Sequence, residues 1–542
     1  MSASSKKKLR NEQEAAKLTE RQIAEQKEAK KVKLYTTAFV AVLAAILVLA
    51  VTIGVTQFVT NSGIREKNTV AMTVGETQLS NADLNYYYID VINNFYSQNG
   101  SYASLFGLDV TKPLNEQPYD ESTGETWADY FLEGAKSNAS AVYALCNAAA
   151  AEGFTLSEDD QLSVETIVSN MELYGTMYGY GDAEGYLKAM YGSGSSEEGF
   201  RKYVEMSTLA TAYQNAYADS LTYADADLRA AEEENYHLYS SFAYNYYYVN
   251  AASFREGGTT DENGATTYSD EELAAAAAAA EEAAKSLTVA DITTAEELDA
   301  AIAALSINAE NTGAASTHYD AQPYGSITES IAQWLSDSSR TEGDLTYLPN
   351  ASTNSEGNET VNGYYVVRYE GTNDNSFPLK NVRHILVSFE GGTTDEYGAT
   401  VYSDEEKASA MTSAEEILNE WKSGEATEAS FAGLAAEKST DTGSTANGGL
   451  YEDIYPGQMV AAFEDWCFAE GRKTGDTGIV ETEYGCHVMY FVGDSDMTYR
   501  DFQITNDLRS NDVTEWYTGI VNNAAVTDGE IKYLNLAMIL SR

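Results

Sequence analysis

The runs Asn381-Val-Arg-His-Ile-Leu-Val387 and Thr482-Glu-Tyr-Gly-Cys-His-Val-Met489 bound the stretch of sequence that decides the fold. Each run surrounds one histidine with β-branched or apolar residues, a composition typical of strands. The protein has only four histidines, so half of them fall in these two runs. The pattern predicts a sheet that carries His384 and His487 on two of its strands.

An ordered series of short motifs lies between the two runs. It consists of Ser439-Thr-Asp441, Gly448-Gly449-Leu450, and then Met459 and Phe463. In this order the motifs resemble the parvulin family of peptidyl-prolyl cis/trans isomerases. The resemblance implies an isomerase domain at residues 380–495, built as a small antiparallel sheet flanked by helices.

The resemblance also implies a role for each motif. The polar residues expected in the catalytic network are His384, Asp441, Thr482 and His487. The residues expected around the proline ring of the substrate are Leu450, Met459, Phe463 and Phe468. Prolyl rotation has a barrier near 20 kcal/mol and requires only that the twisted amide be stabilised, so no cofactor or covalent intermediate is expected. The alternative is that the two histidines only stabilise the sheet.

Charge and cysteine content exclude several classes of protein. The formal net charge is −51, which argues against a nucleic-acid partner. Three scattered cysteines are too few for a disulfide framework or a zinc site, and the acidic stretch Gly391–Glu406 lacks the ligand spacing of a calcium loop. No metal is therefore expected. The sequence leaves open whether Cys467 and Cys486 form a disulfide bridge.

The N-terminal part of the sequence predicts a membrane anchor. Residues 1–33 carry ten basic and five acidic side chains and read as a solvated tail. Residues 34–59 contain no charge and are long enough to cross a bilayer as a single transmembrane helix. The basic flank places the tail in the cytoplasm and the rest of the chain outside the cell membrane. A cleaved signal peptide is the alternative, although the apolar run is longer than is usual for one.

Residues 66–235 show the spacing of an all-helical region after a short strand and turn at Val70–Leu79. Helices are predicted over residues 127–152, 157–174, 184–191 and 196–217. The order resembles the helical N-terminal chaperone domain of SurA- and PrsA-type secretion foldases. That resemblance implies that residues 497–542 return to complete the domain, whereas an unrelated helical spacer is the alternative reading.

An internal repeat predicts a second, degenerate parvulin-like domain at residues 236–372. Residues 256–272 recur at 390–406 with two differences, and Trp334 and Arg340 match Trp466 and Arg472 at one offset. The chemistry is missing, because Tyr365 replaces His487 and Val249 or a neighbour replaces His384. An alanine-rich helix is expected from Leu273 to Leu287.

The sequence therefore predicts an α+β protein with one transmembrane helix, a helical chaperone domain and two parvulin-like domains. Its expected function is that of a membrane-anchored, extracytoplasmic isomerase and foldase. Its expected partners are unfolded secreted polypeptides that contain X–Pro bonds. The alternative from another class is a chaperone that only binds its clients, without useful isomerase activity.

Overall fold

The computed structural model describes residues 3–11, a few residues between 31 and 59, and residues 62–540 except 262, 263, 312, 354–356, 358, 396 and 397. Most of the apolar segment 34–59 lies outside the described residues, as does most of the basic tail. Within the part that is described, no helix is both long and apolar enough to cross a membrane. The chain divides into two compact units, residues 1–221 with 511–542, and residues 222–510.

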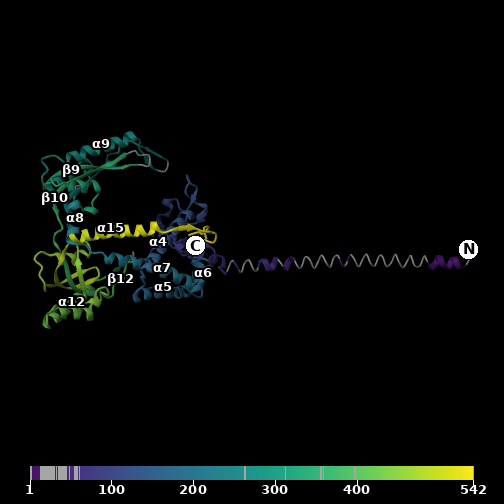
Figure 1. Ribbon diagram of the computed structural model, residues 1–542. Coiled ribbons are helices and arrows are strands. Elements are labelled where there is room, and N and C mark those ends of the chain that lie inside the picture. Colours follow the sequence, from purple (N-terminus) through teal and green to yellow (C-terminus); the bar gives the residue numbers. More distant parts are fainter. Residues whose placement is uncertain are drawn as a thin grey trace. The chain divides into compact units, whose positions relative to one another are not determined.

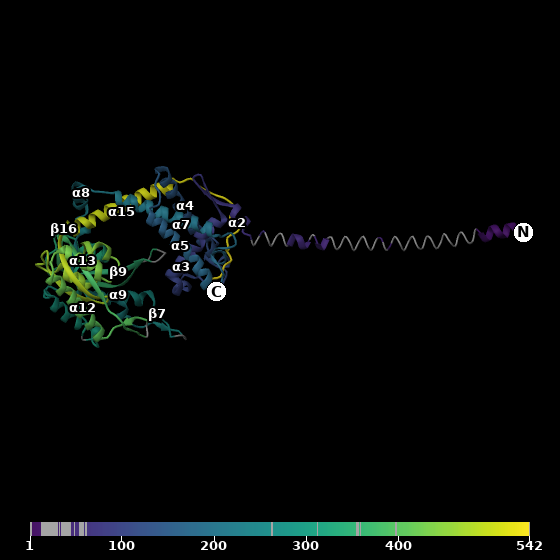
Figure 2. The same ribbon diagram turned by 90° about the horizontal axis from the view of Figure 1, so that it is seen from below.

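The first unit is mainly helical, as the sequence predicts. Its main helices are α2 (Ile64–Asn68), α3 (Asn81–Asn99), α4 (Trp127–Glu152), α5 (Glu158–Met177), α6 (Ala183–Tyr191) and α7 (Glu197–Ser220). Its strands are β1 (Val70–Val74), β2 (Thr77–Ser80), β3 (Pro118–Asp120), β4 (Glu125–Thr126) and β17 (Val526–Asp528). Helix α3 begins at a reciprocal cap in which Ser80 accepts from the backbone of Asp83 and the Asp83 carboxylate accepts from Ser80. Figure 2 shows α3, α4, α5 and α7 gathered into one bundle.

The C-terminal tail belongs to this first unit. Strand β17 pairs antiparallel with β1, and Leu534 is buried in the same apolar core as α3 and α4. The buried side chain of Asn81 donates to the carbonyl of Glu530 and accepts from the backbone of Lys532 and Tyr533. The apolar end of the sequence thus packs against α3 and α4, whereas completion of a chaperone domain by residues 497–542 stays a prediction.

The second unit contains two four-stranded antiparallel sheets. The first is formed by β5 (Ser241–Asn250), β8 (Thr317–Pro323), β9 (Leu345–Thr353) and β10 (Glu359–Asn373). The second is formed by β11 (Pro378–Ser388), β14 (Leu450–Ile454), β15 (Thr477–Thr482) and β16 (Gly485–Thr498). The spatial orders are β8-β5-β10-β9 and β14-β11-β16-β15, so both sheets have the strand order 2-1-4-3 in chain sequence.

Helices pack on both sheets in matching positions: α9 (Asp270–Ser286), α10 (Ala295–Ala303) and α11 (Glu329–Leu335) on the first, and α12 (Asp404–Ser423), α13 (Glu428–Lys438) and α14 (Ala461–Phe468) on the second. The unit also contains α8 (Asp225–Asn235) and the first part of α15 (Tyr499–Asn523), whose second part belongs to the first unit. Helix α9 lies along the first sheet, and α12 lies along the second (Figure 1). The α+β architecture with a helical N-terminal region and antiparallel sheets is confirmed, whereas the domain boundaries drawn from the sequence stay predictions.

The repeated sequence makes the same local contacts twice. Small hairpins, β6 (Thr259–Thr260) with β7 (Thr266–Thr267) and β12 (Thr393–Thr394) with β13 (Thr400–Val401), precede α9 and α12. Arg340 donates to the carbonyl of Trp334 at 3.0 Å, and Arg472 donates to that of Trp466 at 2.9 Å. Each guanidinium also lies over the indole ring that precedes it. The shared sequence therefore specifies a shared local structure.

Apolar clusters lie on both faces of the second sheet. One contains Ile385, Phe431 and Cys486 beneath α12 and α13, and the other contains Phe463 and Cys467 around α14. All three cysteines of the chain are described, and all are free. The bridge left open between Cys467 and Cys486 is not present, since the two thiols belong to different clusters.

Candidate active site

His384 and His487 lie on the adjacent central strands β11 and β16. In the strand register His384 faces Met489 and His487 faces Leu386, so the histidines are diagonal neighbours on the face that carries α14. Their Nδ1 atoms are 3.0 Å apart, and their rings are stacked with centroids 5.2 Å apart. Both side chains are buried, so each ring nitrogen needs a partner.

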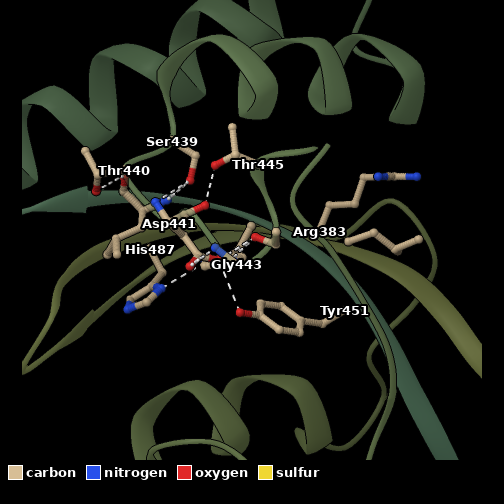
Figure 3. Close-up of polar contacts among 12 residues, drawn as sticks. Arg383, Ser439, Thr440, Asp441, Gly443, Thr445, Tyr451 and His487 are labelled. Atoms are coloured by element: carbon tan, nitrogen blue, oxygen red, sulfur yellow. Dashed lines mark hydrogen bonds and ion pairs between the residues drawn. The ribbon is translucent and has the colours of Figure 1, made fainter. Parts of the chain in front are cut away.

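A continuous hydrogen-bond chain supplies these partners. His384 Nε2 lies 2.9 Å from Asp441 Oδ2, and His487 Nε2 lies 2.8 Å from the hydroxyl of Thr482. The structure thus brings together all four residues that the sequence predicts for the network. Figure 3 shows Asp441 at the centre of this group, with the ring of His487 on one side and the ring of Tyr451 on the other.

The carboxylate of Asp441, at the end of this hydrogen-bond chain, determines which imidazole nitrogens carry a proton. Burial alone would raise the pKa of Asp441, but hydrogen bonds from the Ser444 hydroxyl, His384 and the backbone of Gly443 lower it to about 2. An ionised Asp441 only accepts, so we assign the proton of His384 to Nε2 and let its Nδ1 accept from Nδ1–H of His487. The Nε2 of His487 then accepts from Thr482.

Burial keeps both imidazoles neutral. It lowers the pKa of His384 despite the opposing charge of Asp441. The pKa of His487 is lowered to about 4, first by burial and then by His384. At neutral pH the site is therefore an ordered relay of neutral rings that ends on one carboxylate.

The loop from Ser439 to Gly449 is held on β11 by backbone contacts. Thr440 donates its N–H to Leu386, and His384 donates its N–H to Gly449 at 2.8 Å. Gly449 has φ +73°, and a Cβ on it would lie 2.2 Å from the carbonyl oxygen of His384. Glycine is thus required for the loop to approach the strand this closely. The Arg383 guanidinium contacts the carbonyls of Asn447 and Gly448 and pairs with Glu428.

Phe463 closes the apolar side of the site. Its ring stands edge-on to both imidazoles, with centroids 5.5 Å from that of His384 and 5.4 Å from that of His487. Met459 and Phe468 pack, half-buried, against the same cluster. A residue that grips the ring of a bound proline is expected to be partly open, but Phe463 is only 3% exposed, so that expectation from the sequence is wrong. The ring is both a wall of the site and part of the core.

Two residues of the site were missed by sequence reasoning. Ser444, 1% exposed, donates to Asp441 and lies 3.1 Å from His384 Nε2. Tyr451 donates to Asp441 at 3.1 Å and packs with Met459 and Phe463, whereas its neighbour Leu450 is not part of that cluster. The alternation of side chains along β14 could have identified Tyr451, because neighbouring residues of a strand point to opposite faces and only one of Leu450 and Tyr451 can face the site.

Comparison with known proteins agrees with this geometry. Residues 364–493 match the family described as the PPIC-type PPIASE domain. Foldase protein PrsA 1 of Listeria innocua is 36% identical over 115 residues, which are 21% of this chain and 31% of that protein. Foldase protein PrsA 2 of Listeria monocytogenes is 40% identical over 76 residues, 14% of this chain and 25% of that protein. The chain therefore contains a peptidyl-prolyl isomerase domain of the parvulin type, homologous to part of the PrsA foldases.

These matches are partial. The chain spans no more than about a third of the length of the curated relatives named above. Among solved structures, PrsA from Bacillus subtilis superposes over 74% of this chain and 90% of its own, with 14% identity and a TM-score of 0.27. The peptidylprolyl isomerase PrsA from Bacillus cereus superposes over 28% of this chain and 50% of its own, with 25% identity and a TM-score of 0.18.

Proposed function

We propose that this chain is a membrane-anchored foldase whose domain at 380–495 isomerises X–Pro bonds in secreted polypeptides. The observation that carries the proposal is the relay from Thr482 through both histidines to Asp441, with Phe463 standing against both rings. The match of residues 364–493 to the PPIC-type PPIASE domain and the similarity to PrsA foldases support the same function. The proposed catalytic residues are His384, Asp441, Thr482 and His487.

The proposed chemistry is noncovalent. Rotation about the prolyl bond removes amide resonance and makes the nitrogen more pyramidal, so a site that suits the twisted form accelerates the reaction. The rings of Phe463 and Tyr451, together with Met459, offer an apolar wall for the pyrrolidine ring. The buried relay beside them offers fixed dipoles that need no reorganisation as the charge distribution changes. Neither the apolar wall nor the fixed dipoles act as a nucleophile.

The first test is isomerisation of a tetrapeptide that contains one Ala–Pro bond, measured with the full chain in detergent. The wild-type chain should shorten the time of cis-to-trans conversion, which is tens of seconds without a catalyst. Asp441→Ala should lower kcat/KM at least tenfold, because His384 loses the acceptor that fixes its tautomer. Glu428→Ala is the matched control, since that carboxylate pairs with Arg383 and does not belong to the hydrogen-bond relay.

The same assay separates the enzyme from its alternative. A folded wild-type chain that accelerates no X–Pro peptide, yet suppresses aggregation of an unfolded client, would replace the isomerase with a chaperone that only binds. In that event the relay would be a structural element of the sheet.

The proposed membrane anchor has its own test. The uncharged segment 34–59 and the basic tail before it support a single crossing with the C-terminal domains outside the cell. Protease added to spheroplasts should digest the acidic part of the chain and spare an epitope tag placed at residue 1. A mature protein that begins near residue 60 and is released into the medium would contradict the anchor.

A further inference from the structure

The first sheet of the second unit holds a counterpart of the active site. In the second sheet His384 faces Met489 and Leu386 faces His487. The equivalent pairs of the first sheet are Tyr246 with Val367 and Tyr248 with Tyr365, since the strand order is the same and Gly363 and Gly485 occupy matching positions. Tyr246 and Tyr365 therefore stand where the two histidines stand.

This register corrects the expectation from the sequence for the counterpart of His384. Val249 is fully buried in the cluster on the opposite face, beneath α9 and α10. Tyr246 is instead half-buried, and its ring centroid lies 5.7 Å from that of Tyr365. A pair of phenols has replaced the pair of imidazoles.

The surroundings of the phenol pair are also preserved in position. Tyr319 on β8 faces Tyr244, just as Tyr451 on β14 faces Val382. Ile327 and Ile331 occupy the places of Met459 and Phe463, at the offset that relates Trp334 to Trp466. Both isoleucines are buried in one cluster with Tyr246, Tyr319 and Tyr365 at its border. The apolar residues of the candidate proline pocket thus have counterparts in this sheet, which form an apolar floor, whereas the histidine relay has none.

Four half-buried tyrosines lie on this face of the sheet, and we call them the tyrosine face: Tyr246, Tyr248, Tyr319 and Tyr365. Burial raises the pKa of Tyr246 and of Tyr365, so their phenols remain protonated donors at neutral pH. Tyrosine rings offer flat apolar surface with a polar tip. Prolyl segments suit such a surface, because an extended proline-containing chain is already ordered and leaves its carbonyls without internal partners.

We propose that the tyrosine face is a second binding site of this chain, which holds an X–Pro segment of an extended client without rotating it. The occupant is inferred from the position-by-position match to the candidate isomerase site, so this inference rests on the proposed function. The face has an apolar floor for the pyrrolidine ring and hydroxyls for the neighbouring carbonyls. The histidine relay that would stabilise the twisted amide is replaced, so the bound segment keeps its isomer.

The test counts peptides bound per chain. The probe is a fluorescein-labelled nine-residue peptide with one Leu–Pro bond, titrated by anisotropy and calorimetry into the full chain in detergent. The wild-type chain should bind two peptides. A Tyr246→Leu, Tyr365→Leu double variant should bind one and keep the wild-type kcat/KM on an Ala–Pro tetrapeptide. A twin probe with Leu–Ala should lose binding at the tyrosine face.

A matched control is Tyr364→Leu, which removes a phenol from the opposite face of β10. It should leave the count at two, and thermal melting should show that every variant is folded. One bound peptide on the wild-type chain, or an unchanged count in the double variant, would overturn the proposal. Isomerase activity measured on the same samples distinguishes this outcome from failure of the proposed function, because a chain that isomerises but binds one peptide contradicts only the tyrosine face.

Discussion

Replacing Phe463 with alanine should destabilise the isomerase domain and abolish most of its activity at the same time. The ring is 3% exposed and belongs to the cluster around α14, so its loss should cost about 3–5 kcal/mol, a large part of the 5–15 kcal/mol typical of a whole domain. It also removes the edge-on contact with both imidazoles. Urea unfolding and the tetrapeptide assay should both report the change.

Phe463→Leu separates the two effects, since it keeps most of the buried volume. The matched control is Phe431→Leu, which alters a fully buried ring in the cluster on the other face of the same sheet. Both leucine variants should remain folded with similar losses of stability. Only Phe463→Leu should lower kcat/KM tenfold or more, which corresponds to about 1.4 kcal/mol of transition-state stabilisation. Equal kcat/KM in the two variants would remove Phe463 from the proline pocket.

The helical part of the fold could be predicted closely because its signals are local. Apolar spacing and caps such as the pair Ser80 and Asp83 are read within a few residues, and helix α4 has the bounds predicted for it, 127–152. The sheets were predicted through the motif series and the repeat. Strand register was harder to predict, because it depends on pairing between segments that are distant in the sequence. Only the register shows that Tyr246 of the first sheet occupies the position of His384 in the second.

The polar network was predictable as a set of residues but not as a geometry. The motif series named Asp441 and both histidines, whereas nothing local marked Ser444 as the buried donor to that carboxylate. The exposure of Phe463 was misjudged for a related reason. In a small domain a residue that lines a pocket also has to fill the core, and the sequence alone does not show how much of the Phe463 ring is buried for each purpose.

Lowering the pH should destabilise the isomerase domain within a window set by His487. Its pKa is about 4 in the folded protein and near 6.5 in an unfolded chain, so between these values the unfolded chain binds a proton that the folded one does not. The free energy of unfolding should therefore fall as the pH drops from 6.5 to 4, by up to about 3 kcal/mol. His384, whose pKa is also lowered, acts in the same direction.

Asp441 contributes at lower pH, because its folded pKa of about 2 lies below the unfolded value of 3.8 and its stabilisation is lost only as the pH falls through that interval. His487→Gln removes the imidazole titration and leaves the many surface carboxylates unchanged, so the difference between the two urea-unfolding curves isolates the histidine. Wild type should lose stability relative to the variant from pH 6.5 to 4, and the two profiles should run parallel below pH 4. Histidine labelled with carbon-13 should show the His487 ring neutral at pH 5. A ring already protonated at pH 6, or parallel profiles throughout, would mean that the relay is open to water and that neutral imidazoles are not what the site requires.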